Sequence, residues 1–97
     1  MKRGGWIYIM ANKRYGVLYI GVTGDLERRV AQHRSGAGGA FTSKYRCYRL
    51  VLIEEYPTIE EAIAREKAMK AWKREWKIEL IEQQNPSCDD LYLKLLS

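Results

Sequence analysis

The stretch WIYIMANKRYGVLYIGVT, residues 6–23, decides the fold that the sequence predicts. Its two ends, residues 6–11 and 17–23, are rich in the β-branched and aromatic residues that favour strands. Residues 12–16 between them are polar and end in glycine, which is typical of the connection in an antiparallel hairpin. We therefore expect a β-hairpin near the start of the chain.

The two faces of this hairpin differ because side chains alternate along a strand. One face is plainly aliphatic and collects Ile7, Ile9, Leu18, Ile20 and Val22. The other face carries Tyr8 and Tyr19, with an open position at Gly21. The residues of this second face are therefore not those of a simple aliphatic core.

Downstream, signals for helices and a further strand alternate. Asp25 is suited to cap a helix that runs to about Ser35, and Thr58 with Glu61 forms a capping box for a second helix. The other expected segments are a Gly-rich basic loop (36–46), a strand (48–55), helical residues 73–83 after a break near Trp72, an end at Asn85-Pro86 and a final short helix (89–96). The order β-β-α-β-α-α predicts one α/β (α+β) domain over residues 1–97, with a small three-stranded antiparallel sheet flanked by helices.

Composition narrows the function class. The 97 residues include 17 Lys and Arg against 12 Asp and Glu, a net charge of +5, which favours a polyanionic partner such as nucleic acid. Cys47 and Cys88 lie far apart, and no Cys or His spacing suggests zinc. No apolar run approaches the length of a membrane span. We expect a soluble cytoplasmic protein with reduced thiols and no membrane partner.

The first predicted helix carries polar residues beside its apolar stripe. At 100° per residue, Leu26 and Val30 form the stripe, Arg29 and His33 flank it, and Arg28 points to the far side. In one interpretation Arg29 covers the edge of the core with its aliphatic stem and His33 is an ordinary boundary residue. In the other, both residues belong to a functional site.

The second helix places a carboxylate among apolar residues. Glu66 falls within the stripe set by Ile59, Ala62, Ile63 and Met69. Burying a carboxylate costs several kcal/mol unless a cation or hydrogen bonds satisfy it. A structural salt bridge, for example to Arg29, and a Mg²⁺ ligand both satisfy this requirement.

A run of basic residues follows Glu66 at helical spacing. If the helix were continuous, one basic face suited to phosphates would be formed by Lys70, Lys73, Arg74 and Lys77. The alternative is a solvated face without a ligand. Trp72, Trp76 and Leu80 fit packing better than base stacking.

Taken together, these residues resemble a known family. Trp6-Ile7-Tyr8 and Tyr19-Ile20-Gly21 resemble the two signature tripeptides of the GIY-YIG nucleases, with tryptophan in place of the first glycine. Arg29, Glu66 and Asn85 resemble the characteristic arginine, the acidic residue and the distal asparagine of that family. Further segments are similar to its small single-domain bacterial branch: Phe41-Thr42-Ser43-Lys44-Tyr45, Trp72-Lys73-Arg74 and Asn85-Pro86.

The resemblance implies a metal-dependent endonuclease that acts on nucleic acid, with DNA expected over RNA and a role in repair or recombination. Glu66 would hold one Mg²⁺ or Mn²⁺, Tyr8 would be the general base or its relay, and Tyr19 would share its hydrogen-bond network. Arg29 would bind phosphate oxygens, and His33 is a rival for the base. Asn85 would complete the catalytic set, while the nucleic-acid backbone would be contacted by Lys44, Lys70, Lys73, Arg74 and Lys77.

Two other functions remain open at this point. The first is a non-catalytic nucleic-acid-binding module that retains the fold. The second is a catalytic subunit that depends on a partner protein or a homodimer for specificity, because the chain is too short for a separate DNA-binding module.

Overall fold

The computed structural model describes residues 4–96. Its sheet contains β1 (Gly5–Ala11), β2 (Leu18–Thr23) and β3 (Arg49–Tyr56), all antiparallel, in the order β2-β1-β3. The helices are α1 (Leu26–Arg34), α2 (Ala40–Tyr45), α3 (Ile59–Lys70), α4 (Arg74–Gln84) and α5 (Tyr92–Leu95). The predicted α+β fold with a three-stranded antiparallel sheet is confirmed. The predicted bounds of 1–97 include residues 1–3 and 97, which lie outside the described part.

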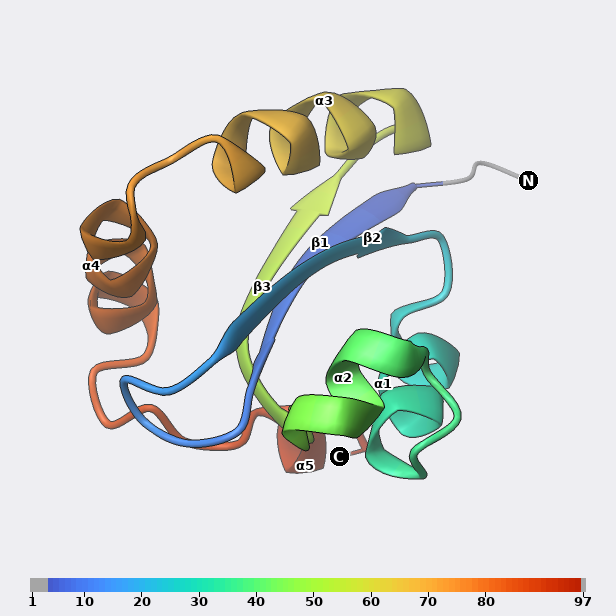
Figure 1. Ribbon diagram of the computed structural model, residues 1–97. Coiled ribbons are helices and arrows are strands. Elements are labelled where there is room, and N and C mark those ends of the chain that lie inside the picture. Colours follow the sequence, from blue (N-terminus) through green and yellow to red (C-terminus); the bar gives the residue numbers. More distant parts are fainter. Residues whose placement is uncertain (1–3, 97) are drawn as a thin grey trace.

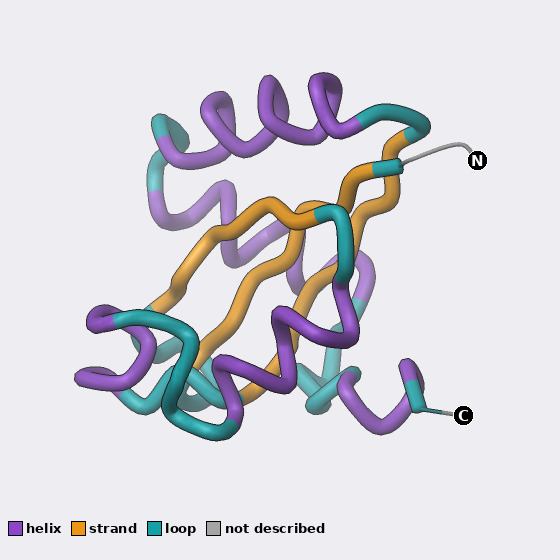
Figure 2. The backbone as a smooth tube through the Cα atoms, turned by 90° about the vertical axis from the view of Figure 1, so that its right-hand side faces the viewer, coloured by secondary structure: helices purple, strands orange, loops and turns teal. Residues whose placement is uncertain are grey.

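Helices cover both faces of the sheet (Figure 1). On one face, Ile7, Ile9 and Ile20 pack with Ala62 and Met69 of α3 and Ile81 of α4. On the other face, Tyr8 and Met10 pack with Leu26 and Val30 of α1. Figure 2 shows the strands crossing between α3 on one side and the shorter helices on the other. The predicted division of the hairpin into an aliphatic face and a tyrosine face is confirmed.

The expected loop over residues 36–46 is wrong in part, because it contains α2. Gly39 precedes this helix at φ 136°, a backbone conformation that suits glycine. Thr42 is buried, and its hydroxyl lies 2.9 Å from Nδ1 of His33. Tertiary contacts made by Thr42 therefore hold a short helix that the glycine-rich composition did not predict.

The helical region after residue 59 is divided, as the expected break near Trp72 suggests. α3 ends at Lys70, and α4 begins at Arg74 after the extended residue Lys73. The single basic face that a continuous helix would create is therefore absent, which corrects that hypothesis. The predicted stripe also misplaces Ile63, whose side chain is 37% exposed.

The final helix is shorter than expected. It spans only Tyr92–Leu95, rather than residues 89–96. Oδ1 of Asp90 accepts hydrogen bonds from the backbone N–H groups of Leu50 and Tyr92, so the preceding residues follow the end of β3 instead of forming helix. Within residues 4–96, no helix has both the length and the apolar character needed to cross a membrane.

Candidate active site

Tyr8 lies at the centre of the candidate site. It belongs to the middle strand, β1, and its side chain is 1% exposed. Its partner on β2 is Gly21. A Cβ atom at Gly21 would collide with the Tyr8 ring and hydroxyl. The tyrosine ring therefore lies across a position where only glycine leaves room.

His33 holds the hydroxyl of Tyr8. It lies in the last turn of α1 and is completely buried, so it is not the boundary residue of the simpler interpretation. Nε2 of His33 is 2.9 Å from Oη of Tyr8, and Nδ1 is 2.9 Å from Oγ1 of Thr42. Oγ1 of Thr42 donates to the carbonyl of Gly39 at 3.5 Å. Because the Thr42 hydroxyl gives its proton to Gly39, it can only accept from His33. Nδ1 of His33 then carries the imidazole proton, and the Tyr8 hydroxyl donates to Nε2.

Burial sets the protonation states of this pair. It raises the pKa of Tyr8 to about 12, with the Arg29 guanidinium acting in the opposite direction and Tyr19 and Glu66 adding to the rise. Burial, together with the positive charge of Arg29, lowers the pKa of His33 to about 4. At neutral pH the structure therefore pairs a neutral tyrosine with a neutral histidine whose acceptor nitrogen, Nε2, takes the tyrosine hydrogen bond.

Arg29, and not Arg28, faces this pair. Burial disfavours the Arg29 cation, but the hydroxyls of Tyr8 and Tyr19 outweigh that effect and raise its pKa. Its Nη1 donates to Gln32 at 2.9 Å, and its Nη2 donates to the carbonyl of Gly38 at 2.8 Å. These two bonds fix the guanidinium beside Tyr8. Arg28 is exposed.

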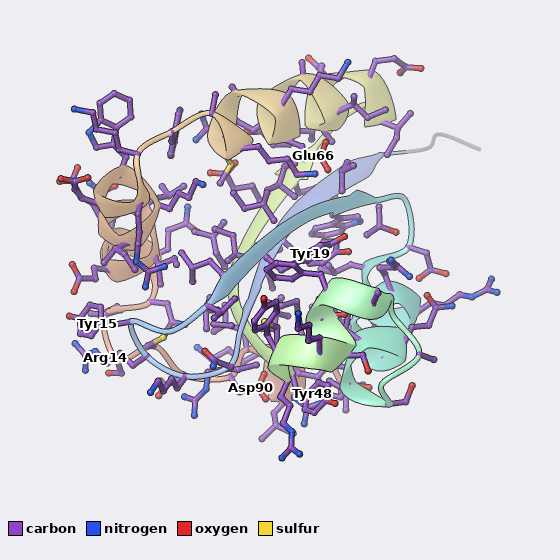
Figure 3. All side chains as sticks on the ribbon, in the orientation of Figure 1. Arg14, Tyr15, Tyr19, Tyr48, Glu66 and Asp90 are labelled. Carbon is purple, nitrogen blue, oxygen red and sulfur yellow. The ribbon has the colours of Figure 1, made fainter. Side chains whose placement is uncertain are left out.

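Tyr19 continues the site towards the surface. Its ring centroid lies 6.3 Å from that of Tyr8 and 5.3 Å from that of His33. Figure 3 shows Tyr19 on β2, next to α2. An open depression lies beside Arg29, and it is lined by Thr23, Asp25, Arg28, Arg29, Gln32 and Ile59.

Glu66 approaches the site from α3. Figure 3 shows it on the side of α3 nearest the strands, and its charge contributes to the raised pKa of Tyr8. The side chain is 16% exposed, and its carboxylate lies 3.2 Å from Nζ of Lys70, whose side chain is 54% exposed. The salt bridge to Arg29 that the sequence left open is not present, because the ion-pair partner is Lys70.

The side chains that could ligate a metal ion limit which metal this site could hold. Among residues 4–96, no group of three or more His, Cys, Asp or Glu side chains could hold an ion. This excludes a closed zinc site of the usual kind within that range. Glu66 alone fits Mg²⁺ or Mn²⁺, which Asp and Glu often bind through one carboxylate together with substrate phosphate and water.

Asn85 is not brought into this group. It follows α4 on the other face of the sheet, where its Nδ2 donates to the carbonyls of Val51 and Asp89. Its Oδ1 accepts from the backbone N–H of Asp89. All of its side-chain groups are therefore used to tie the chain after α4 to β3.

The predicted basic residues are also separated. Lys70 pairs with Glu66, Lys73 precedes α4 with Nζ 5.9 Å from the Trp76 ring, and Lys77 is half-buried. Nη2 of Arg74 donates to the carbonyls of Tyr15 and Gly16 in the hairpin turn. Lys44 is exposed on α2, with Nζ 5.3 Å from the Tyr45 ring.

Three contributors were not predicted as site residues. Thr42 fixes the imidazole of His33, and Gln32 and Gly38 fix the guanidinium of Arg29. Gly38 also leaves room for the imidazole, because a Cβ atom there would collide with His33. In the sequence, the glycine-rich segment after α1 is the one signal that the backbone at Gly38 passes close to His33.

Comparison with known proteins identifies the family of this chain. Residues 4–79 match the GIY-YIG catalytic domain family. A UPF0213 protein of Staphylococcus saprophyticus is 37% identical over 78 residues, covering 80% of this chain and 94% of that protein. A UPF0213 protein of Haloquadratum walsbyi is 39% identical over 66 residues, covering 68% and 74%.

A solved structure supports the same assignment. The solution NMR structure of a UPF0213 protein from Bacillus halodurans has a TM-score of 0.56 and 30% identity, covering 90% of this chain and 92% of that one. The matched range, residues 4–79, contains the residues of the candidate site: Tyr8, Tyr19, Arg29, His33 and Glu66. The chain belongs to the GIY-YIG catalytic domain family, a family of nucleases.

Proposed function

We propose that this chain is a divalent-metal-dependent endonuclease that hydrolyses phosphodiester bonds, with DNA as its substrate. The observation that carries this proposal is the buried Tyr8–His33 hydrogen bond beside Arg29. A purely structural pair at this position would not need an adjacent half-buried guanidinium and a carboxylate on the next helix.

In the proposed reaction Tyr8 acts as a relay. With its pKa raised to about 12, the tyrosine is not a free phenolate that could take a proton directly. As the attacking water gives its proton to Oη of Tyr8, the tyrosine proton moves to Nε2 of His33. The water oxygen then bonds to phosphorus, the bond to the leaving oxygen breaks, and that oxygen takes a proton from solvent.

Arg29 has two roles in this scheme. Its fork of N–H donors binds the phosphate oxygens and neutralises charge that develops on them. Its positive charge also lowers the pKa of His33 in the free protein. A bound phosphate offsets this charge, so substrate binding makes His33 a better proton acceptor at the step that needs one.

Glu66 would hold the metal. When bound there, Mg²⁺ or Mn²⁺ supplies positive charge at the scissile phosphate. The Glu66 carboxylate has to exchange its contact with Lys70 for the cation. The exposed position of Lys70 allows that exchange without leaving a buried charge behind.

The test is a nicking assay on supercoiled plasmid, titrated with Mg²⁺ and Mn²⁺ and stopped with a chelator. We expect metal-dependent nicking by the wild type and by Glu60→Gln, a control at an exposed position on the same helix. Glu66→Gln should lose nearly all cleavage while it still folds and binds DNA. Its stability should change by less than about 1 kcal/mol, because the ion pair that it removes is a partly exposed i,i+4 pair.

Two results would overturn the proposal. Nicking by Glu66→Gln at the wild-type rate would remove Glu66 from the site. DNA binding without cleavage at any metal concentration would instead indicate a non-catalytic nucleic-acid-binding module.

A further inference from the structure

Aromatic rings continue from the candidate site to the protein surface. The Phe41 centroid lies 5.8 Å from that of Tyr19, and the Tyr45 centroid lies 4.8 Å from that of Phe41. Phe41 is 44% exposed and Tyr45 is 39% exposed. Tyr19, Phe41 and Tyr45 therefore form a row of tilted rings, which we call the aromatic row, and its inner end, Tyr19, lies next to Tyr8.

Core packing does not account for the outer part of this row. Phe41 and Tyr45 belong to neither of the two buried clusters of the sheet. The residue that attaches α2 to the body of the protein is Thr42, which is 1% exposed. The helix thus buries a threonine and presents its two aromatic rings to solvent, the reverse of the usual arrangement.

The surroundings of the aromatic row are positively charged. Nζ of Lys44 lies 5.3 Å from the centroid of Tyr45, and Arg46 is exposed directly after α2. Residues 28–53 contain six basic residues and no Asp or Glu. A row of exposed rings with cations beside it matches the requirements of unpaired bases, whose faces stack on aromatics while the phosphates meet the cations.

We infer that the aromatic row is a stacking platform for unpaired bases next to the scissile phosphate. The substrate is then single-stranded nucleic acid, or a duplex with unpaired bases at the point of cleavage. The location of the cut bond rests on the proposed function, whereas binding of bases to the platform does not.

A second exposed aromatic pair provides a matched control. Trp76 on α4 is 52% exposed, and its ring centroid lies 6.3 Å from that of Trp72. Its depression is lined by Glu79 as well as the tryptophans, and no aromatic contact links it to Tyr8 or Tyr19 within residues 4–96. A general effect of removing an exposed ring would therefore appear at Trp76 as well as at Phe41.

The experiment measures binding in the presence of a chelator, so that no cleavage occurs. Fluorescence anisotropy would follow labelled oligo-dT, oligo-U and a blunt duplex with wild type, Phe41→Leu, Phe41→Tyr and Trp76→Leu. Leucine keeps an apolar cover but removes the flat ring, whereas tyrosine keeps the ring. Thermal melts of each variant check that the fold is intact.

We expect the wild type to prefer a single strand over the duplex. Phe41→Leu should weaken single-strand binding by about 5- to 20-fold, the loss expected when a base gives up one stacking partner. Phe41→Tyr and Trp76→Leu should remain within about twofold of wild type, and the duplex affinity should not change. The higher of the oligo-dT and oligo-U affinities assigns the platform to DNA or RNA.

Three outcomes would overturn the inference: no preference for single strands, an equal loss of duplex binding in Phe41→Leu, or an equal loss in Trp76→Leu. Failure of the proposed nuclease activity would leave these binding results standing. Conversely, loss of the binding preference would leave metal-dependent nicking of plasmid untouched, so the two proposals fail separately.

Discussion

The two faces of the sheet differ in chemistry although the same strand, β1, contributes to both. Ile7 and Ile9 of β1 point into an aliphatic cluster, whereas Tyr8 between them points into a group of hydroxyl, imidazole and guanidinium side chains. Within residues 4–96, every buried side-chain nitrogen or oxygen has a hydrogen-bond partner. The aliphatic face can therefore stabilise the fold by burial, while the polar face keeps Tyr8 and His33 neutral and hydrogen-bonded beside the Arg29 cation, which leaves these residues available for chemistry.

The largest expected effect separates two neighbouring arginines. Arg29→Ala should lower the nicking rate by roughly 10²- to 10³-fold, because it removes a fixed donor for charge on the phosphate. Arg28→Ala should lower it by no more than a few-fold, since Arg28 is exposed. Single-turnover rates at saturating metal provide the measurement. Similar losses of nicking rate in the two variants would show that Arg29 has no special role beside Tyr8.

Acid should weaken the polar face through His33. Its folded pKa of about 4 is below the ordinary value of 6.5, so the unfolded chain takes up a proton at a pH where the native protein does not. Stability is therefore lost as the pH falls from about 6.5 to about 4, with a total contribution of about 3 kcal/mol from this group.

His33 is the only histidine in the chain, so NMR titration of its imidazole reads this pKa without assignment ambiguity. Equilibrium unfolding in urea between pH 7 and pH 4 gives the accompanying loss of stability. A measured pKa of 6.5 or above would mean that the imidazole is not held neutral by burial.

Replacing Asn85 should lower stability and leave the nicking rate nearly unchanged, whereas replacing Arg29 should mainly lower the nicking rate. Asn85→Ala leaves the buried carbonyl of Val51 without the Nδ2 donor and removes two further bonds to Asp89, so it should destabilise the fold by about 2 kcal/mol. The nicking rate of the folded protein should stay within a few-fold of wild type. Chemical denaturation and nicking below the melting temperature separate the two effects. A large rate loss in a fully folded variant would place Asn85 in the chemistry after all.

The sequence could predict what depends on local pattern. Alternation in residues 6–23 placed Ile7 and Tyr8 on opposite faces, and the helical phase of α1 chose Arg29 over Arg28 for the side facing the sheet. The predicted N-cap at Thr58 was also correct, since its Oγ1 accepts the backbone N–H of Glu61, while the Glu61 carboxylate accepts from the Thr58 hydroxyl. Each of these features is fixed by residues close together in the chain.

Features that depend on distant contacts could not be predicted. α2 requires Thr42 to reach His33, and the burial of His33 itself requires Tyr8 from another strand. The partner of Glu66 was also missed, although Lys70 is only four residues away on the same helix, because a local lysine and a distant arginine can each neutralise a carboxylate. Only the path of α3 across the sheet decides which of them is within reach.

The smallest expected effect concerns the basic residues around the break between α3 and α4. Arg74 donates to the carbonyls of Tyr15 and Gly16, so it connects α4 to the hairpin turn and is not free for phosphate. Arg74→Ala should therefore cost about 1 kcal/mol of stability and leave the salt dependence of DNA binding unchanged. Lys44→Ala, on α2 beside Tyr45, should reduce the slope of log affinity against log salt by about one, as loss of one phosphate contact does. Binding titrations at several salt concentrations compare the two variants directly. If Arg74→Ala reduced the slope and Lys44→Ala did not, nucleic acid would lie along α4 instead of along α2, and the contrast between the two faces would have to be reversed.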